Sequence, residues 1–263
     1  MTFELAISTM HKTEEEILLM LHEMNVDCDC IVINQCDEEK EIEISYKNNK
    51  ITVIFTLERG LSRSRNMAIS KSNAEIIAIA DDDLFYYDNF QTTVCDFYKS
   101  HPAADIVVFN MDNYERKYPE KTYKCKFYEL SSFTSMQITL KREKVKSKFN
   151  ELFGTGSKIF DSGEENIFLA DCYRDHNSVY YCHKKILLRE QKQSSWFKGY
   201  NDEKFLSDRG AVYYAISKFL FPLYVLRFAF LKRSLVRPKT SFEVIKLMLL
   251  GKKEYKKYVD GKQ

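Results

Sequence analysis

The segment at residues 60–89, GLSRSRNMAISKSNAEIIAIADDDLFYYDN, constrains the fold more than any other part of the chain. Residues 76–80 (IIAIA) are uncharged and rich in β-branched side chains, which predicts a strand covered on both faces. Asp81, Asp82 and Asp83 follow directly. Ligands of open α/β sheets bind in the crevice outside the carboxyl ends of the strands. The acidic triplet is therefore a candidate ligand site, and a solvated acidic turn is the alternative.

Adjacent carboxylates repel one another unless a cation or hydrogen bonds compensate. Hard divalent cations such as Mg²⁺ and Mn²⁺ prefer carboxylate oxygens, often together with substrate phosphates. The preceding turn, residues 59–65, contributes Arg59, Arg63 and Arg65, whose planar guanidinium groups suit phosphate oxygens. Ser62 is a candidate N-cap for the helix that follows this turn. An anionic ligand beside a metal ion fits this segment, whereas ordinary surface charge is the alternative for Arg59 and Arg63.

Strands and helices alternate through the first half of the chain. Residues 3–8 and 30–34 read as buried strands, and Thr13 with Glu16 forms a capping-box pattern that starts a helix between them. This is a βαβ unit. Further strands are expected at 41–46, 51–56 and 105–110, and residues 84–89 are expected to turn into a helix that runs through Tyr98. Repeated alternation of this kind predicts an α/β fold with a mostly parallel sheet.

Two motifs in this order resemble the family 2 glycosyltransferases of the GT-A fold. The first is G-L-S-R-S-R-N, a short helix and IIAIADDD, and the second is the F-G-x-G of residues 153–156 followed by G-E-E-N-I-F-L at residues 163–169. The second motif is similar to the family's GED-x-x-F segment, with Glu165 where Asp is more common. The resemblance covers roughly residues 3–195. It implies a Rossmann-like GT-A catalytic domain at residues 1–195 and leaves residues 196–263 as a helical C-terminal extension.

The resemblance implies an inverting, metal-dependent transfer of a sugar from a nucleotide-diphosphate donor to a carbohydrate or lipid-linked glycan hydroxyl. Family habit suggests UDP as the carrier and a bacterial surface polysaccharide, capsular or exopolysaccharide, as the product. Asp81 and Asp83 would hold Mn²⁺ or Mg²⁺. Asp82 would position the donor or the metal, and Arg65 would face the nucleotide. By their positions after the first two strands, the candidates for the base and ribose are Ser8, Thr9, Asn34 and Asp37, with polar turn residues as the alternative.

On the acceptor side, the resemblance makes Glu165 the general base, with Glu164 in reserve. Both lie in the first turn of a predicted helix, where the helix dipole stabilises a carboxylate. The alternative is the ordinary preference of helix N-termini for acidic residues. Gly163 and Trp196 are candidate acceptor or sugar contacts, although Trp196 fits core packing equally well. The His that often precedes Ser-Ser in the family is Gln193 here, so aspartates, phosphate and water would hold the metal.

Composition excludes some partners. Lys and Arg number 40 and Asp and Glu 38, so a net charge of +2 gives no global field for nucleic acid. Seven cysteines without a C-x-x-C pair predict reduced thiols and a cytoplasmic protein rather than a disulfide framework. The first residues have no basic-then-apolar signal pattern.

Residues 211–231 are strongly apolar, but Lys218, Pro222 and Arg227 interrupt them, and no uncharged stretch is long enough to span a bilayer. Because basic residues flank this segment, it predicts peripheral attachment to an anionic membrane face. A packing arm or a homodimer interface is the alternative.

Two other function classes remain open from the sequence. A sugar-phosphate nucleotidyltransferase also uses an α/β sheet and an acid-bound metal, but it would normally show a Gly-rich loop near the N-terminus, and residues 8–16 contain no glycine. A non-catalytic protein that binds sugar nucleotides is the second, and turnover of a donor would argue against it.

Overall fold

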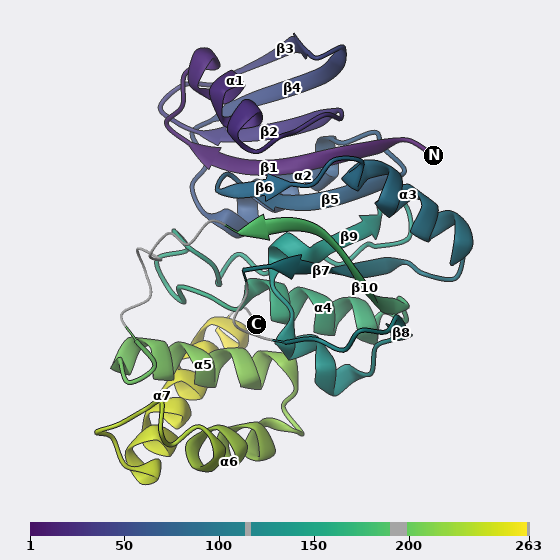
Figure 1. Ribbon diagram of the computed structural model, residues 1–263. Helices are drawn as coiled ribbons and strands as arrows, with labels where there is room; N and C mark the ends of the chain where they lie inside the picture. The colour runs from purple at the N-terminus through teal and green to yellow at the C-terminus, as the bar shows by residue number, and fades with distance from the viewer. Residues whose placement is uncertain (114–116, 190–198, 262–263) are drawn as a thin grey trace.

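The computed structural model describes residues 1–113, 117–189 and 199–261. One twisted sheet runs through the larger part of the molecule, and three C-terminal helices lie together beyond its lower end (Figure 1). The strands are β1 Phe3–Met10, β2 Cys30–Gln35, β3 Lys40–Tyr46, β4 Asn49–Thr56, β5 Ile76–Asp81, β6 Leu84–Tyr86, β7 Ile106–Asp112, β8 Tyr123–Lys124, β9 Ile138–Lys141 and β10 Val179–Arg189. The helices are α1 Glu14–Glu23, α2 Leu61–Lys71, α3 Phe90–Ser100, α4 Glu164–Arg174, α5 Glu203–Ile216, α6 Phe221–Leu231 and α7 Ser241–Asp260, with short 3₁₀ helices at Phe127–Ser132 and Ser135–Gln137.

The strand order within the described residues is β3-β4-β2-β1-β5-β9-β7-β10-β6, and β8 adds to β10. Strand β1 pairs in parallel with β2 and β5, and β2 pairs in parallel with β4. The carboxyl ends of these four strands therefore meet at one edge, where the crevice of an open α/β sheet lies. The predicted α/β class with a mostly parallel central sheet is confirmed.

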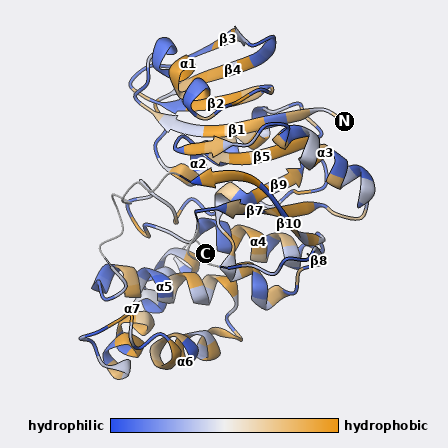
Figure 2. Cartoon of the chain, viewed as in Figure 1, coloured by the Kyte–Doolittle hydropathy of each residue, from blue (hydrophilic) through white to orange (hydrophobic). Residues whose placement is uncertain are grey.

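Helices cover both faces of the sheet because its central strands are apolar on both sides. Alternate residues of β1 show this: Leu5 and Ile7 pack in one core with residues of α1 and α3, whereas Ala6 packs in a second core with residues of α2 and α4. Figure 2 shows the central strands as a largely hydrophobic layer. The protein is thus a three-layer sandwich that holds the carboxyl edge of the sheet rigid.

Of three local predictions, one is confirmed and two are wrong. Thr13 caps α1, its side chain accepts from the Glu16 backbone, and Glu16 returns a bond to the Thr13 backbone. Ser62, by contrast, is not an N-cap: α2 starts one residue after Gly60, and the Ser62 hydroxyl donates to the Phe153 carbonyl, 2.7 Å away. The segment 84–89 begins with the short strand β6 rather than turning directly into a helix, and α3 starts at Phe90.

Strands β9 and β10 were not expected from the sequence. Strand β9 runs antiparallel between β5 and β7, and β10 pairs in parallel with β7 and antiparallel with β6. The antiparallel β6–β10 pair brings Leu84, the residue after the acidic triplet, opposite Arg189. Strand β9 has only four residues, and the polar run His183, Lys184 and Lys185 interrupts β10, so neither has the apolar pattern that marks a strand.

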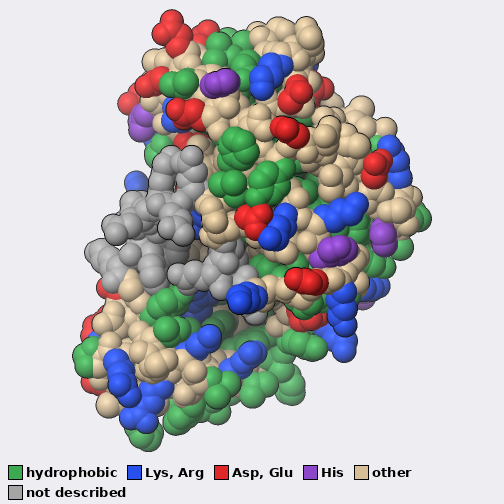
Figure 3. Space-filling model, in the orientation of Figure 1, with side chains coloured by type: hydrophobic (Ala, Val, Ile, Leu, Met, Phe, Trp, Pro, Cys, Tyr) green, Lys and Arg blue, Asp and Glu red, His purple; other side chains and the backbone are tan. Residues whose placement is uncertain are grey.

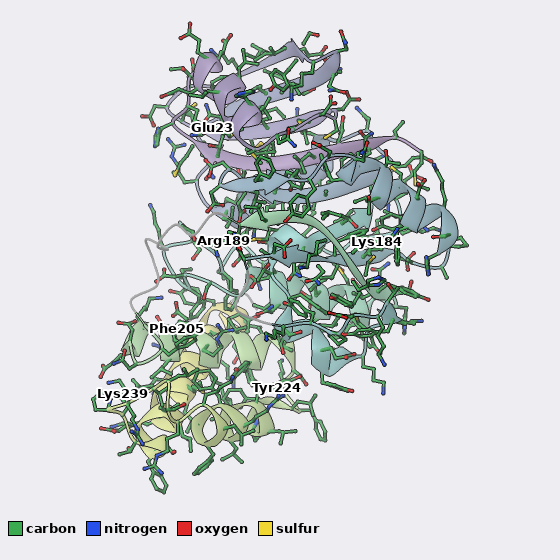
Figure 4. All side chains as sticks on the ribbon, viewed as in Figure 1. Glu23, Lys184, Arg189, Phe205, Tyr224 and Lys239 are labelled. Carbon is green, nitrogen blue, oxygen red and sulfur yellow. The ribbon has the colours of Figure 1, made fainter. Side chains whose placement is uncertain are left out.

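The apolar segment 211–231 is divided between α5 and α6, with Pro222 in the first turn of α6. Helices α5 and α7 cross closely at Gly210 and Gly251, where an added Cβ would lie 2.1 Å from the Met248 carbonyl oxygen and 1.7 Å from that of Ser207. Phe205 of α5 packs in one cluster with Val225 and Phe228 of α6, and Tyr224 of α6 packs in a second with Val212 of α5; Figure 4 labels Phe205 and Tyr224. None of the described helices is both long and apolar enough to cross a membrane. The predicted boundary between residues 195 and 196 lies outside the described residues.

Candidate functional site

The acidic triplet forms the turn between β5 and β6 at the carboxyl edge of the sheet. Asp81 is the last residue of β5, and Asp82 and Asp83 connect it to β6. All three side chains are half-buried. The Thr9 hydroxyl, at the end of the neighbouring β1, donates to Asp82 Oδ2 over 2.6 Å, and Lys12 Nζ lies 3.8 Å from the same oxygen. The triplet is therefore oriented by its neighbours and is not a solvated turn.

Arg65 connects this edge to the start of α4. Its side chain is 1 % exposed, and its guanidinium donates to Asp81 Oδ1 over 2.7 Å, to Glu164 Oε1 over 2.6 Å and to Ser135 Oγ over 2.8 Å. Burial lowers the pKa of Arg65, but Asp81 and Glu164 more than offset this effect and leave it raised, so the guanidinium stays charged. The sequence predicted that Arg65 faces the nucleotide, and the structure finds it bonded to two carboxylates.

Glu164 and Glu165 begin α4 but have different surroundings. Glu164 is buried and forms an ion pair with Arg65, whereas Glu165 is half-buried, forms no ion pair with the described residues, and has a hydrogen bond to its own backbone. Burial raises the pKa of Glu165 to about 8, Glu164 adds to the increase, and Arg65 and Arg209 oppose it. Glu165 is therefore mostly protonated at neutral pH, so burial outweighs the helix dipole that was expected to stabilise its carboxylate, and it can accept a proton only after losing its own.

Glycines bring the second motif against the first. The backbone of Gly156 lies so close to Gly60 that an added Cβ on Gly156 would sit 3.3 Å from the Gly60 Cα. Gly163 precedes α4 with φ +92°, and its Cβ would lie 2.5 Å from Val212 Cγ2 of α5. Glycine at position 163 is therefore required for the contact between α4 and the C-terminal helices. Its expected contact with an acceptor sugar stays a prediction.

The residues predicted to cradle the base and ribose gather at the ends of β1 and β2. Ser8 and Thr9 are buried, and Ser8 Oγ accepts from the Ser64 hydroxyl of α2 over 2.8 Å. Asn34 is fully buried and forms two bonds with the backbone of Lys12, accepting over 3.1 Å and donating over 2.6 Å. Asp37 is exposed and lies 2.6 Å from Arg59. Ser8 thus lies opposite Asp81 in the β1–β5 pairing and Thr9 bonds Asp82, whereas Asn34 shapes the loop after β1 and Asp37 pairs with Arg59. Their contact with a base or ribose stays a prediction.

Three residues that form hydrogen bonds within the site were not predicted from the sequence. Ser135 accepts from Arg65, Ser64 links α2 to β1, and Gln35 Oε1 accepts from the Gly60 backbone N–H over 2.7 Å. Ser64 lies inside the first motif and Gln35 follows the second predicted strand, so their positions gave a signal. Ser135 lies in a 3₁₀ turn with no distinguishing pattern.

The acidic turn offers a divalent cation few protein ligands. Among the described residues, no three His, Cys, Asp or Glu side chains converge on one point. Asp81 Oδ2 bonds no described residue, and Asp83 Oδ2 lies 3.9 Å from Arg189 Nε, at the end of β10 (Figure 4). Two carboxylates at one edge fit a cation that takes its other ligands from substrate phosphates and water. The predicted Trp196 lies outside the described residues.

Comparisons with known proteins agree with this geometry. The family model described as "Glycosyl transferase family 2" matches residues 9–163, more than half of the chain. The structure of residues 1–349 of S. aureus TarS in complex with UDP-GlcNAc is similar, with a TM-score of 0.59 and 13 % identity, and covers 99 % of this chain and 92 % of that one. The mannosyltransferase PcManGT from Pyrobaculum calidifontis, in complex with GDP-Man and Mn²⁺, has a TM-score of 0.51 and 12 % identity over 97 % of this chain and 73 % of that one. No curated protein matches the sequence.

At these sequence identities the two similar structures establish the fold alone, and the family model establishes membership of the family. The matched residues 9–163 include the α2 turn, the acidic triplet and the glycine that precedes α4. The chain belongs to glycosyl transferase family 2, and it is a glycosyltransferase.

Proposed function

We propose that this protein is an inverting, metal-dependent transferase that moves a sugar from a nucleotide-diphosphate donor, a UDP-sugar, to a hydroxyl of a carbohydrate or a lipid-linked glycan. The observation that carries this proposal is that the Arg65 guanidinium joins the carboxyl edge of the sheet to the start of α4. Its Nη2 donates to Asp81 at that edge and its Nη1 to Glu164, whose neighbour Glu165 has a pKa raised to about 8.

On the donor side, Asp81 and Asp83 would bind Mn²⁺ or Mg²⁺ together with the donor's diphosphate. When bound, the cation neutralises the charge that develops on the leaving nucleoside diphosphate. Arg65 fixes the direction of the Asp81 carboxylate, and Thr9 does the same for Asp82, which would position the donor. Ser8, Thr9, Asn34 and Asp37 would form the walls of the base and ribose site. Arg65 would thus act on the nucleotide through Asp81.

On the acceptor side, Glu165 would remove the proton of the attacking hydroxyl as its oxygen bonds to the anomeric carbon. The bond from that carbon to the diphosphate breaks on the opposite face, so the configuration inverts. A base with a pKa near the working pH accepts this proton most effectively. Glu164 is bonded to Arg65 and would hold α4 in place, and Gly163 and Trp196 are proposed acceptor contacts.

The choice of UDP is supported by one neighbour, because TarS was solved with UDP and with UDP-GlcNAc, whereas PcManGT was solved with GDP-Man and Mn²⁺. A cytoplasmic setting is supported by the cysteines, all seven of which are free and buried. We propose surface polysaccharide, capsular or exopolysaccharide, as the product class.

The test is calorimetric binding of UDP, GDP and CMP, with and without Mn²⁺, to the wild type and to Asp83→Ala. Binding of one nucleotide that needs Mn²⁺ and is lost in the variant would support the proposal and identify the carrier. Failure of all three nucleotides to bind, with or without Mn²⁺, would refute it. Release of the nucleotide from the matching sugar donor would then separate a transferase from a binding protein without turnover.

A further inference from the structure

Helix α6 is apolar on both sides, although only one side is covered. Its inward residues Phe221, Tyr224, Val225 and Phe228 are buried against α5 and α7. Its outward residues Leu223, Leu226, Phe230 and Leu231 recur at helical spacing and are exposed, Leu231 to 72 %. A helix that is apolar all round is normally buried on all sides. The outward face of α6 therefore lacks a cover within the described part of the chain.

Two phenylalanines extend this face beyond the helix. Phe219, just before α6, is 89 % exposed, and Phe242, in the first turn of α7, is 82 % exposed. The Ser241 hydroxyl donates to the Ala229 carbonyl over 2.9 Å, which fixes the start of α7 beside the end of α6. We call these exposed side chains the α6 patch: Phe219, Leu223, Leu226, Phe230, Leu231 and Phe242. Figure 3 shows hydrophobic side chains gathered along the lower edge of the molecule, next to basic ones.

The stretch of chain that carries the α6 patch is basic. Residues 217–242 contain six basic side chains and no acidic one: Lys218, Arg227, Lys232, Arg233, Arg237 and Lys239. Over residues 217–263, Lys and Arg number 12 against 3 Asp and Glu, whereas residues 1–216 contain 28 against 35. The net charge of +2 thus conceals a basic C-terminal part and an acidic remainder.

The acidic side chains nearest in the chain do not cancel this charge. Glu203 lies 2.9 Å from Lys239, and Glu243 accepts from the backbone and hydroxyl of Thr240 at the start of α7. Within the described residues, Lys239 is the one basic side chain of the six that forms an ion pair. The other five form no ion pair with the described residues, so no salt bridge neutralises their charges.

We propose that the α6 patch binds an anionic membrane surface, with α6 lying in the plane of the interface. Its leucines and phenylalanines would enter the boundary between headgroups and acyl chains, while the long basic side chains would extend to the lipid phosphates. A second copy of the chain fits less well, because a symmetric contact would bring two basic faces together without acidic partners.

The C-terminal helices are packed directly against the proposed site, since Val212 of α5 contacts the turn at Gly163 that precedes Glu164 and Glu165. A membrane-bound α6 would hold α4 at a fixed height above the lipid. If the proposed function is correct, this placement suits a lipid-linked acceptor. The membrane contact itself requires neither donor nor metal, so it can fail while the proposed function stands.

The test is co-sedimentation of the full chain with vesicles of phosphatidylcholine alone or of phosphatidylcholine with phosphatidylglycerol, at low and high salt. We expect binding to the anionic vesicles that is at least tenfold weaker in high salt. The double variant Leu223→Ser/Phe230→Ser should no longer bind the anionic vesicles. The triple variant Arg227→Gln/Lys232→Gln/Arg233→Gln should bind them at least tenfold more weakly than the wild type. A matched control, Leu19→Ser/Tyr128→Ser, removes two exposed apolar side chains elsewhere and should bind like the wild type.

The molar mass of the same proteins, measured by light scattering, tests the alternative that a second copy of the chain covers the α6 patch. A wild-type dimer that becomes a monomer in Leu223→Ser/Phe230→Ser would overturn the proposal in favour of a second copy. Absence of wild-type binding to anionic vesicles, or equal binding to neutral ones, would overturn it as well. All the substituted side chains are exposed, and an unchanged melting temperature of each variant confirms that lost binding is not lost folding.

Discussion

The two carboxylate regions joined by Arg65 differ in how much of their chemistry the fold has already satisfied. At the end of β5, one oxygen of Asp81 accepts from Arg65 and one oxygen of Asp82 accepts from Thr9. At the start of α4, Glu164 accepts from the other Nη of Arg65, while its neighbour Glu165 forms no ion pair with the described residues. The buried guanidinium thus holds two acids in place, and the acid without an ion pair is the one whose pKa rises to about 8. Glu164 and Glu165 share the first turn of α4, so the helix N-terminus does not explain their difference. Their bonding partners do.

The largest expected effect separates the two neighbouring glutamates. Glu165→Gln should lower the turnover of the donor about 10³-fold, because general-base catalysis contributes factors of this order. Glu164→Gln keeps a hydrogen-bond acceptor for Arg65 and should lower turnover by about tenfold or less. Steady-state release of the nucleotide measures both. An equal loss of turnover in the two variants would contradict the different roles given to Glu165 and Glu164.

The second prediction concerns the buried cation. Arg65→Met should lower the free energy of unfolding by about 3–5 kcal/mol, because it leaves Glu164 buried without its partner. Urea unfolding measures the change. The control is Arg63→Met on the same helix, whose ion pair with Glu151 is exposed and should contribute under about 1 kcal/mol.

A smaller effect is expected on stability as a function of pH. Since the pKa of Glu165 is about 8 in the folded state and near 4.5 otherwise, the folded protein keeps a proton between these values that the unfolded chain releases. This group therefore lowers stability progressively as the pH rises from about 4.5 to 8. Glu165→Gln should remove this loss. Relative to the wild type, its free energy of unfolding should rise by about 2 kcal/mol more at pH 8 than at pH 5, as measured by urea unfolding. A gain that does not depend on pH would show that the carboxyl is not titrating in this range.

The smallest expected effect concerns the hydrogen bond from Thr9 to Asp82. Thr9→Val removes the hydroxyl that bonds Asp82 and should lower the free energy of unfolding by about 1 kcal/mol. If Asp82 positions the donor, nucleotide affinity measured by calorimetry should fall severalfold. The variant Ser70→Ala removes an exposed local bond on α2 and serves as the control. An unchanged nucleotide affinity would mean that Asp82 does not depend on Thr9.

The sequence predicted the parts of this fold that depend on local pattern. The Thr13 cap, the buried strands β1, β2 and β5 and the acidic turn after β5 all follow from periodicity and residue type. It did not predict β9 or β10, because β9 has only four residues and a run of three polar residues interrupts β10. The burial of Arg65 could not be predicted for another reason, since it depends on Glu164, 99 positions away in the sequence.

The pH dependence of wild-type donor turnover tests the central assignment most directly. We predict that kcat/KM with the donor identified by calorimetry rises about tenfold per pH unit below pH 8 and levels off above it, since Glu165 must lose its proton before it can act. The small residual rate of Glu165→Gln should lack this rise. A wild-type rate that stays flat from pH 5 to pH 9, or a Glu165→Gln variant with the same profile, would contradict the assignment of Glu165 as the base.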